Sequence, residues 1–486
     1  MTDRRFFRQE CYIAGEWVGP NGAAGDETVE VRNPATGEIL GAVPNFGRDQ
    51  TKRAIDAAYE AFPEWRSLPP QDRARYCMAI HDALMDNRDE LGELLTIEMG
   101  KPLPEAIGEI AFGAAFFKWF SEEATRIYGD VIPSPWPNKR IILTKEPVGV
   151  VGAITPWNFP SAMLARKMAA ALAAGCPIIC KPAIETPFSA FAYGVIADDI
   201  GLPKGVLSII TGDPAPIADE FCENPKLRKI TFTGSTAVGK GLASKALAHM
   251  KRVSMELGGH APLIIFDDAD LERAVEGAMI SKFRNSGQTC VCSNRIYVQA
   301  GLYDEFAERF SAKARELKVG NGLESGIQQG PLITEKAVLK VEDHIADATQ
   351  KGASVIAGGK RDQLGLTFFE PTVLRDVTAD MKIMREETFG PVAPLIKFDS
   401  EEEVVIQANN TEYGLAAYVY TNDLGRSWRM IDALEYGMIA INEGVSSTPV
   451  APFGGVKGSG QGREGSRYGL DDYINIKYAL IGGLEK

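Results

Sequence analysis

Short apolar runs recur between residues 148 and 259, and stretches of helical length separate them. The runs are VGVVGAIT (148–155), PIICKP (177–182), VLSIITG (206–212), KITFTG (229–234) and RVSMELGG (252–259). Runs that are continuously apolar and rich in β-branched residues are typical of parallel strands covered on both faces by helices. The pattern therefore predicts an α/β fold whose sheet is doubly wound and of the dinucleotide-binding type.

The helix that follows the first run has well-defined ends. Pro160 suits the first turn of a helix and Gly175 suits the position just after its last turn. The segment between them, SAMLARKMAAALAA, is rich in alanine. We expect this helix to pack closely on the sheet.

Other patterns flank this region. Residues 50–126 read as helices, and residues 129–149 contain alternating prolines, which cannot donate to a central strand ladder and so predict an extended arm or an edge hairpin. A second alternating α/β series runs from Ala261 to about Asn442. The segment PFGGVKGSGQGREG (452–465) reads as a glycine-rich loop, and LDDYINIKYALIGG reads as a final strand.

Composition narrows the classes of function. The chain has 486 residues, 45% hydrophobic and 24% charged, which suits a globular protein of two or three domains. A net charge of −13 argues against binding nucleic acid, and it means that an anionic substrate needs a local cationic pocket. The longest apolar run, Met168 to Cys180, is too short to cross a membrane and contains Pro177. We expect no membrane partner.

The cysteines and histidines indicate neither a disulfide framework nor a metal site. The cysteine count, seven, is odd, no CxxC pair occurs, and the four histidines form no close ligand pair. The N-terminus lacks the apolar segment of a signal peptide. Reduced thiols in the cytoplasm are the simplest interpretation.

Three polar residues in separate motifs are candidates for catalysis. Cys290 in NSGQTCVCSNR lies where local dipoles can lower the pKa of an exposed thiol, although a lone cysteine is more often a buried apolar residue. Glu256 in MELGG follows a buried run, where apolar surroundings disfavour its charge; the alternative is a strand-end or ion-paired carboxylate. Asn158 in TPWNFP is able to donate to an oxyanion, or else it only caps a turn.

Taken together, these motifs match a family. TPWNFP, KPAxxTP, FTGSTxxG, MELGG, GQxC, EETFGPV and PFGGxKxSGxGRE occur in this order, and the chain from RNPATGE (32–38) onward resembles the aldehyde dehydrogenase superfamily. The resemblance implies a Rossmann-type cofactor domain (1–127 and 147–259), an α/β catalytic domain (260–451), and an oligomerisation arm and strand (128–146 and 470–486). A homodimer or homotetramer is the implied assembly.

The resemblance also implies a chemical role for each candidate. Cys290 attacks the aldehyde and forms a thiohemiacetal, Asn158 stabilises the oxyanion, and Glu256 activates the water that hydrolyses the thioester. The residues that match the family's cofactor site are Trp157, Lys181, Gly234, Ser235, Glu387 and Phe389.

The cofactor preference stays open at this point. Members that prefer NAD often carry a glutamate where this chain has Ile184, so NAD and NADP are both expected cofactors. The stretch Gly234 to Lys240 also fits the start of a P-loop, but Gly241 stands where a P-loop has serine or threonine. A P-loop-like nucleotide-binding protein is therefore a distant alternative.

The sequence around the candidate nucleophile is most similar to the succinate-semialdehyde dehydrogenase branch. There, the positions of Arg166, Arg284 and Ser447 bind the distal carboxylate of the substrate, with Thr448 as the alternative to Ser447. Oxidation of succinate semialdehyde to succinate is the leading expectation, and glutarate semialdehyde or a sulfonated aldehyde of the sulfolactaldehyde type is the alternative. Cys292 is expected to form a reducible disulfide with Cys290, a redox switch, or else to be an inert thiol.

Overall fold

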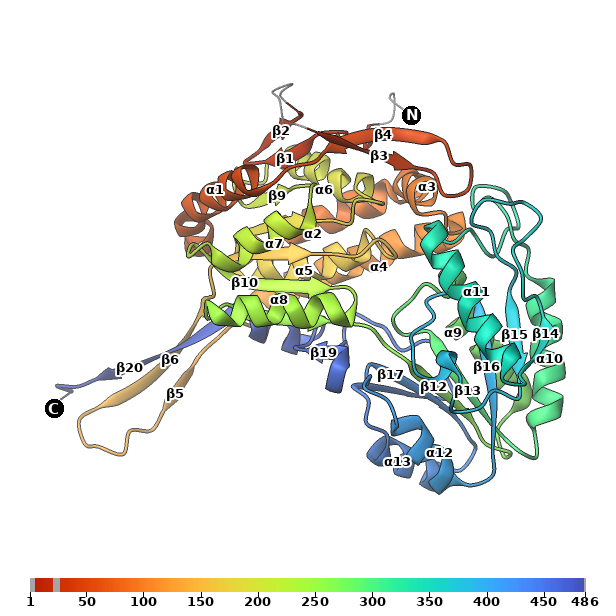
Figure 1. Ribbon diagram of the computed structural model, residues 1–486. Coiled ribbons are helices and arrows are strands. Elements are labelled where there is room, and N and C mark those ends of the chain that lie inside the picture. The colour runs from red at the N-terminus through yellow and green to blue at the C-terminus, as the bar shows by residue number, and fades with distance from the viewer. Residues whose placement is uncertain (1–4, 21–26, 485–486) are drawn as a thin grey trace.

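Two large β-sheets, one in each of two α/β lobes, organise the computed structural model, which describes residues 5–20 and 27–484 (Figure 1). The first sheet has eight strands, and its five inner strands are parallel. Each predicted apolar run contains one of them, so the prediction of a parallel sheet is confirmed. In chain order they are β7 (Val150–Ile154), β8 (Ile178–Lys181), β9 (Leu207–Ile209), β10 (Leu227–Thr233) and β11 (Arg252–Glu256).

Antiparallel strands close both edges of this sheet. The strands β1 (Cys11–Ile13) and β2 (Glu16–Val18) lie beyond β9, and β19 (Gly460–Gln461) pairs with β11. The prediction of a simple loop over residues 452–465 was therefore incomplete, because this segment adds an edge strand beside Glu256. A separate hairpin consists of β3 (Thr28–Arg32) and β4 (Ile39–Pro44).

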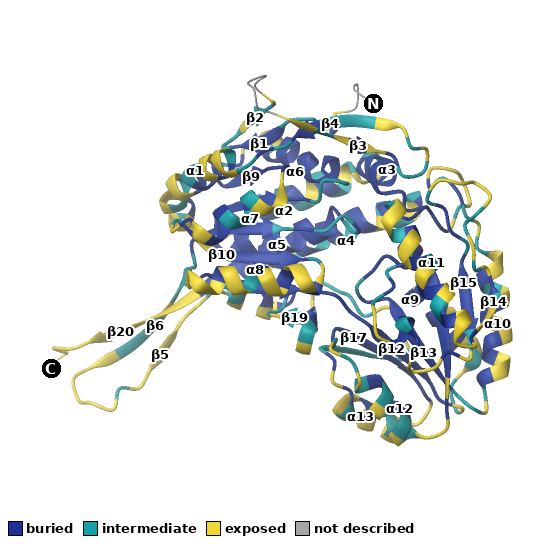
Figure 2. Cartoon of the chain, in the orientation of Figure 1, coloured by how far each residue is buried: buried dark blue, intermediate teal, exposed yellow. Residues whose placement is uncertain are grey.

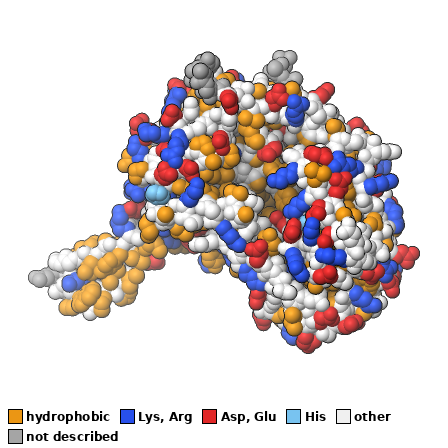
Figure 3. Space-filling view, viewed as in Figure 1, with side chains coloured by type: hydrophobic (Ala, Val, Ile, Leu, Met, Phe, Trp, Pro, Cys, Tyr) orange, Lys and Arg blue, Asp and Glu red, His pale blue; other side chains and the backbone are white. Residues whose placement is uncertain are grey.

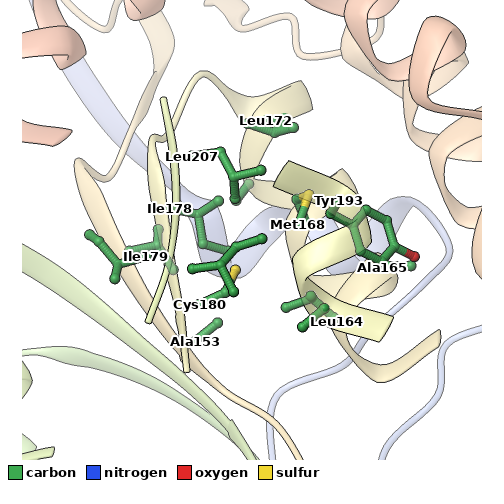
Figure 4. Packing of buried hydrophobic residues seen from close by; sticks show 14 of the residues in the cluster. Ala153, Leu164, Ala165, Met168, Leu172, Ile178, Ile179, Cys180, Tyr193 and Leu207 are labelled. Atoms are coloured by element: carbon green, nitrogen blue, oxygen red, sulfur yellow. The ribbon is translucent and has the colours of Figure 1, made fainter. Parts of the chain in front are cut away.

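Helix α5 (Ala162–Ala174) is the most deeply buried helix of this lobe, since every one of its residues is buried. It ends where Gly175 adopts φ 92°, as predicted. Figure 4 shows Leu164 and Met168 of α5 beside Ile178 and Cys180 of β8. The small alanine side chains let the helix approach the sheet, and this puts even its charged residues inside the lobe.

The other helices of the first lobe either lie on its sheet or pack on the outside of the helical layer that contains α5. The predicted helical region 50–126 contains four helices. Two of them share the segment 73–95, because one helix ends and the next begins at Asn87. The helices are α1 (Arg48–Ser67), α2 (Pro70–Asp86), α3 (Arg88–Met99), α4 (Leu103–Ala124), α6 (Phe188–Asp199), α7 (Pro214–Glu223) and α8 (Thr236–Ala248).

The second lobe contains a seven-stranded sheet in which only β14 is antiparallel to its neighbour. This confirms the second α/β series. Its strands are β12 (Ala261–Ile265), β13 (Ser293–Gln299), β14 (Ser354–Ala357), β15 (Thr372–Arg375), β16 (Val392–Phe398), β17 (Ala416–Tyr420) and β18 (Met438–Ile441). Its helices are α9 (Leu271–Phe283), α10 (Tyr303–Glu316), α11 (Glu335–Gln350), α12 (Glu401–Asn409) and α13 (Leu424–Ala433).

The proline-rich segment forms an arm that projects from the first lobe (Figure 1). The strands β5 (Asp130–Ile132) and β6 (Arg140–Pro147) pair antiparallel, and the final strand β20 (Ile474–Ile481) extends the same sheet. Figure 2 shows the arm largely exposed, and Figure 3 shows that much of its surface is hydrophobic. Within residues 5–20 and 27–484, no helix is long and apolar enough to cross a bilayer.

Candidate active site

A cavity of about 980 Å³ lies between the two lobes, and both contribute to its wall. Figure 3 shows the molecule hollowed at this place. Most of the site residues expected from the sequence line it: Trp157, Asn158, Arg166, Gly234, Ser235, Arg284, Cys290, Glu387, Phe389 and Ser447. Three do not: Lys181, Glu256 and Cys292.

Cys290 follows a tight turn, η1 (Arg284–Gly287), in which two residues other than glycine have left-handed backbone conformations. Asn285 has φ 52° and Ser286 has φ 56°. Such residues cost roughly 1–3 kcal/mol each and persist only where neighbours hold them. Here the Asn285 side chain donates to the carbonyl of Asn158 at 3.0 Å, and Ser286 Oγ donates to that of Gly330 at 2.9 Å. The turn that presents Cys290 is thus tied to the segment that carries Asn158.

The surroundings of Cys290 raise the pKa of its thiol. Burial raises its pKa to about 12, Arg166 acts in the opposite direction, and Glu387 and Glu256 raise the pKa further. The lowered pKa expected from local dipoles is therefore not found, because the cavity wall removes the sulfur from water without placing a sufficient positive charge beside it. Cys290 is still the only cysteine of the described residues that is not fully buried.

The side-chain amide of Asn158 has a defined orientation in the wall of the cavity. Its Nδ2 donates to the carbonyl of Gln288 at 3.0 Å, and its Oδ1 is buried without a hydrogen-bond partner among the described residues. The carbonyl of Gln288 fixes which way the amide points, since Oδ1 in that place would face another acceptor. The second hydrogen on Nδ2 is left for a ligand in the cavity.

A buried ion pair between Lys101 and Glu109 positions this segment, and the sequence reasoning missed it. Lys101 Nζ donates to the carbonyl of Asn158 at 2.8 Å. Glu109 Oε1 accepts from the backbone N–H groups of Ser161 at 2.9 Å and Ala162 at 3.1 Å, at the start of α5. The one signal in the sequence was an acidic residue within the otherwise apolar stretch IGEIAFGAAFF.

Glu256 ends β11 and is 2% exposed. It does not line the cavity, although Leu257 and Gly258 do, and neither of its carboxylate oxygens has a hydrogen-bond partner among the described residues. Burial raises the pKa of Glu256 well above 4.5, and the nearby Glu464 raises it further. This agrees with the expected cost of charge at this position, but the carboxyl group is set back from the cavity.

Arg166 forms a buried ion pair with Glu464, which the sequence reasoning did not anticipate. Its guanidinium lies 4.3 Å from the ring centroid of Phe453, and its Nη2 is buried without a hydrogen bond to any described residue. Arg284 lies 5.4 Å from the ring centroid of Phe159, and the described residues offer it no ion pair within 4.0 Å. Two guanidinium groups thus face one largely apolar cavity.

The remaining predicted positions lie as follows. Ser447 lines the cavity and Thr448 does not, so the geometry favours Ser447 of the two. Cys292 is fully buried, and its Sγ donates to the carbonyl of Lys282 at 3.4 Å. Cys290 and Cys292 are both free thiols.

A second group of cavity residues suits a dinucleotide. Gly234 and Ser235 precede the first turn of α8, whose free N–H groups attract phosphate. Glu387 Oε1 accepts from the N–H of Gly259 at 3.0 Å, which leaves Oε2 for a ribose hydroxyl. Burial raises the pKa of Glu387 to about 7. The rings of Trp157 and Phe389 meet at 87° with centroids 5.5 Å apart and line the same cavity.

The two glycines after Glu256 allow this crowding. A Cβ on Gly258 would lie 2.9 Å from Glu387 Oε2, and one on Gly259 would lie 2.1 Å from the carbonyl oxygen of Cys290. Only glycine fits at Gly259, because backbone is the obstacle there. The GG pair therefore lets the carboxylate of Glu387 and the loop of Cys290 approach the end of β11.

Two lysines that the sequence linked to nucleotide binding, Lys181 and Lys240, lie outside the cavity. Lys181 Nζ donates to the carbonyl of Pro182 at 3.2 Å and does not line the cavity, whereas Glu185, which the sequence reasoning passed over, does. Lys240, the P-loop lysine of the distant alternative, forms an exposed ion pair with Glu412 at 2.8 Å. It does not line the cavity, so the P-loop alternative gains no support.

Comparison with known proteins fits this site. The glutarate-semialdehyde dehydrogenase of Pseudomonas aeruginosa is 54% identical over all of both chains. The NADP-dependent succinate-semialdehyde dehydrogenase of Escherichia coli is 53% identical over 99% of each chain, and the 3-sulfolactaldehyde dehydrogenase of Pseudomonas putida is 53% identical over 100% of this chain and 99% of its own.

A solved structure and a family model agree with these relatives. The crystal structure of succinate-semialdehyde dehydrogenase from Burkholderia pseudomallei superimposes with a TM-score of 0.97 at 56% identity, covering 99% of each chain. The model of the aldehyde dehydrogenase family matches residues 21–479. The chain belongs to the aldehyde dehydrogenase family.

Proposed function

We propose that this protein is an NAD(P)-dependent dehydrogenase that oxidises a short aldehyde with a distal anionic group, with succinate semialdehyde as the leading substrate. The observation that carries the proposal is that one cavity contains both a thiol, Cys290, and two guanidinium groups, Arg166 and Arg284. Guanidinium groups recognise carboxylates and sulfonates through paired hydrogen bonds. An overall charge of −13 makes such a local cationic pocket necessary.

The names of the relatives support the same class of substrate. They are described as acting on succinate semialdehyde, glutarate semialdehyde and sulfolactaldehyde. All three aldehydes carry an anionic group away from the reacting carbon. Glutarate semialdehyde and a sulfonated aldehyde therefore remain the alternatives to succinate semialdehyde.

The proposed chemistry begins at Cys290. The thiol of Cys290 gives its proton to solvent, its Sγ forms a bond to the aldehyde carbon, and the carbonyl oxygen gains the negative charge. The free hydrogen of Asn158 Nδ2 and the backbone N–H of Cys290 donate to this oxyanion. The nicotinamide, when bound, supplies the acceptor for the hydride that the carbon loses as its C=O bond re-forms, which leaves a thioester on Cys290. Trp157, Gly234, Ser235, Glu387 and Phe389 would hold the cofactor.

Hydrolysis then releases the acid. Glu256 accepts a proton from water, the water oxygen forms a bond to the thioester carbon, and the bond to Cys290 Sγ breaks. Glu256 is set back from the cavity, so its side chain must rotate toward Cys290 for this step. The raised pKa makes it a stronger base than an ordinary glutamate.

We also propose a role for each lobe and for the arm, a role for Lys181, and a cellular location. The lobe with the eight-stranded sheet is the cofactor domain, the lobe with the seven-stranded sheet is the catalytic domain, and the arm mediates homo-oligomerisation as a dimer or tetramer. A role for Lys181 at the adenosine ribose rests on the family motif alone. A cytoplasmic location is supported by the seven cysteines, which are all free thiols.

The redox switch at Cys292 is also a proposal. Cys290 and Cys292 are separated by one residue, but Cys292 Sγ points to the carbonyl of Lys282, so forming the disulfide requires a side-chain rotation. We expect peroxide to inactivate the enzyme and dithiothreitol to restore its activity. A Cys292→Ala variant with equally reversible inactivation would refute the switch.

The experiment that tests the proposed function measures steady-state kinetics with NAD and with NADP. The substrates are succinate semialdehyde, glutarate semialdehyde, a sulfonated aldehyde and, as the uncharged comparison, butanal. We expect kcat/KM for the anionic aldehydes to exceed that for butanal by at least 100-fold, or about 2.7 kcal/mol. In Arg166→Met and Arg284→Met the preference should fall by about tenfold or more. An unchanged preference in both variants would exclude this anion site.

A further inference from the structure

Four charged side chains form a buried cluster behind the cavity wall. Glu464 pairs with Arg166 and with Lys167, the adjacent residue on α5. A Cβ on Gly454 would lie 3.0 Å from Glu256 Oε1, and Phe453, the residue before Gly454, pairs through its backbone with Glu464, so the carboxyl group of Glu256 lies beside this ion pair. All four are at most 4% exposed. Because water is excluded, the charge of each member depends strongly on the others.

The cationic side chains of this cluster outnumber its ionised carboxylate. Arg166 and Lys167 are the two cationic members, and they hold the pKa of Glu464 below its ordinary value despite its burial. Burial and Arg166 lower the pKa of Lys167, and Glu464 acts in the opposite direction. With Glu464 ionised, one surplus positive charge remains for a further anion. Inside the cluster the candidate is Glu256, whose two oxygens have no hydrogen-bond partner among the described residues.

An anion bound in the cavity would compete with Glu256 for the same positive charge. Arg166 is the only member of the cluster that lines the cavity, and its Nη2 lacks a hydrogen bond to any described residue. An anion in the cavity would therefore meet Arg166 directly while Glu464 holds its Nε side. Such an anion and an ionised Glu256 would both draw on the one surplus charge.

We infer that the distal anion of the substrate, by occupying Arg166, promotes protonation of Glu256, so that anion binding and the charge of the base are coupled. This inference rests on the proposed function, because it requires Arg166 to be the anion site. The coupling would raise the proton affinity of Glu256 while an anionic acyl group is attached to Cys290, so the ionised fraction of Glu256 would be a stronger base and would be smaller. It would also remove a negative charge near the thiol when an anionic aldehyde first enters.

The other charged groups near Glu256 do not replace this coupling. Glu464 and Arg463 approach from the segment that precedes the last 3-10 helix, Arg166 and Lys167 from α5, and Cys290 from the loop after η1. Arg463 is partly exposed and donates to the carbonyls of Gly455 and Gly462, so its position does not depend on a ligand.

The test compares a monoanion with a neutral molecule of the same shape. Butyrate and butyramide are titrated against the alkylation of Cys290 by iodoacetamide, and protection at each pH gives the dissociation constant. The other six cysteines are buried, which favours reaction at Cys290. Because the assay needs no turnover, it applies equally to variants without activity.

We expect butyrate to bind more weakly as pH rises from 5 to 9, while butyramide binding stays constant. A coupled shift of one pKa unit corresponds to a tenfold loss of affinity over the titration. In Glu256→Gln, butyrate should still bind and the pH dependence should disappear. If the wild-type protein bound butyrate with the same affinity at every pH, the inference would be overturned without any variant. A pH dependence of butyrate binding that persists in Glu256→Gln would also overturn it, since Glu387 would then be the titrating group.

Failure of the proposed function would look different. If Arg166→Met bound butyrate as well as the wild-type protein at every pH, the assignment of the anion site would be wrong. If Arg166→Met weakened butyrate binding at low pH but the wild-type affinity did not depend on pH, only the coupling would be wrong. A circular dichroism spectrum equal to that of the wild-type protein would verify that the variant is folded.

Discussion

Arg166 of α5 and Glu464 of the glycine-rich segment form an ion pair buried in the wall of the cavity that contains Cys290. The partners are distant in the chain, and the pair joins the first lobe to the segment that also carries β19. Burying two charges is costly unless both stay paired, so this contact constrains stability as well as the site.

Removing the charge of Glu464 should therefore destabilise the fold. In Glu464→Gln, Arg166 and Lys167 would share no full negative partner, and we expect the free energy of unfolding to fall by about 3 kcal/mol. The matched control is Glu412→Gln, which breaks the exposed pair with Lys240 and should cost less than about 1 kcal/mol. Denaturant titration measures both, and equal small losses would show that the buried pair contributes little.

The orientation of Asn158 predicts a defect in the first chemical step. Asn158→Ala should slow the burst of NAD(P)H formation by about 10²–10³-fold, because one oxyanion donor is lost. Glu109→Gln weakens the ion pair with Lys101 that positions this segment, and it should slow the burst by about tenfold. Glu122→Gln, on the exposed side of the same helix, should leave it unchanged. A normal burst in Asn158→Ala would contradict the assigned role.

Glu387 predicts that cofactor binding depends on pH. Its pKa, raised to about 7 by burial, means that the carboxylate is ionised above pH 7 and protonated below it. The ionised form is the better acceptor for ribose hydroxyls, so affinity for NAD(P)H should be full above pH 8 and should fall as pH drops through 7. Fluorescence titration measures the dissociation constants. Glu387→Gln should bind more weakly and without this dependence; a dependence retained in that variant would point to another group.

The arm predicts an interface between copies of the chain. Ile476 is 70% and Tyr478 is 55% exposed, and they lie on the same face of β20. Replacing both with glutamate should reduce the molar mass measured by light scattering. Lys477 points to the other face and pairs with Glu146, so Lys477→Gln should keep the wild-type mass. A double variant that also keeps this mass would mean that β20 does not mediate assembly.

Features that depend on local pattern were predictable from the sequence. The five apolar runs each contain a parallel strand because such runs are stable only between two helical layers. Gly175 ends α5 because glycine adopts φ 92° without strain. Most of the site residues identified by motif matches with a known family do line the cavity, including Ser447 on a loop with no regular structure.

Features that depend on contacts between distant segments were not predictable. Arg166 was located by its match to the family, but nothing near it in the chain identified Glu464 as its partner. The left-handed residues Asn285 and Ser286 are held by hydrogen bonds to other loops, so their own residue types gave no signal. The pKa of Cys290 was misjudged because burial depends on the packing of both lobes.

The central claim is that Cys290 carries the acyl group of an anionic aldehyde and that Glu256 is needed to release it. The most direct measurement is mass spectrometry of Glu256→Gln after incubation with succinate semialdehyde and NAD(P)⁺. The account predicts a succinyl adduct on the peptide that contains Cys290, and none in Cys290→Ser. An adduct on another residue, or no adduct while NAD(P)H still forms in one burst, would contradict it.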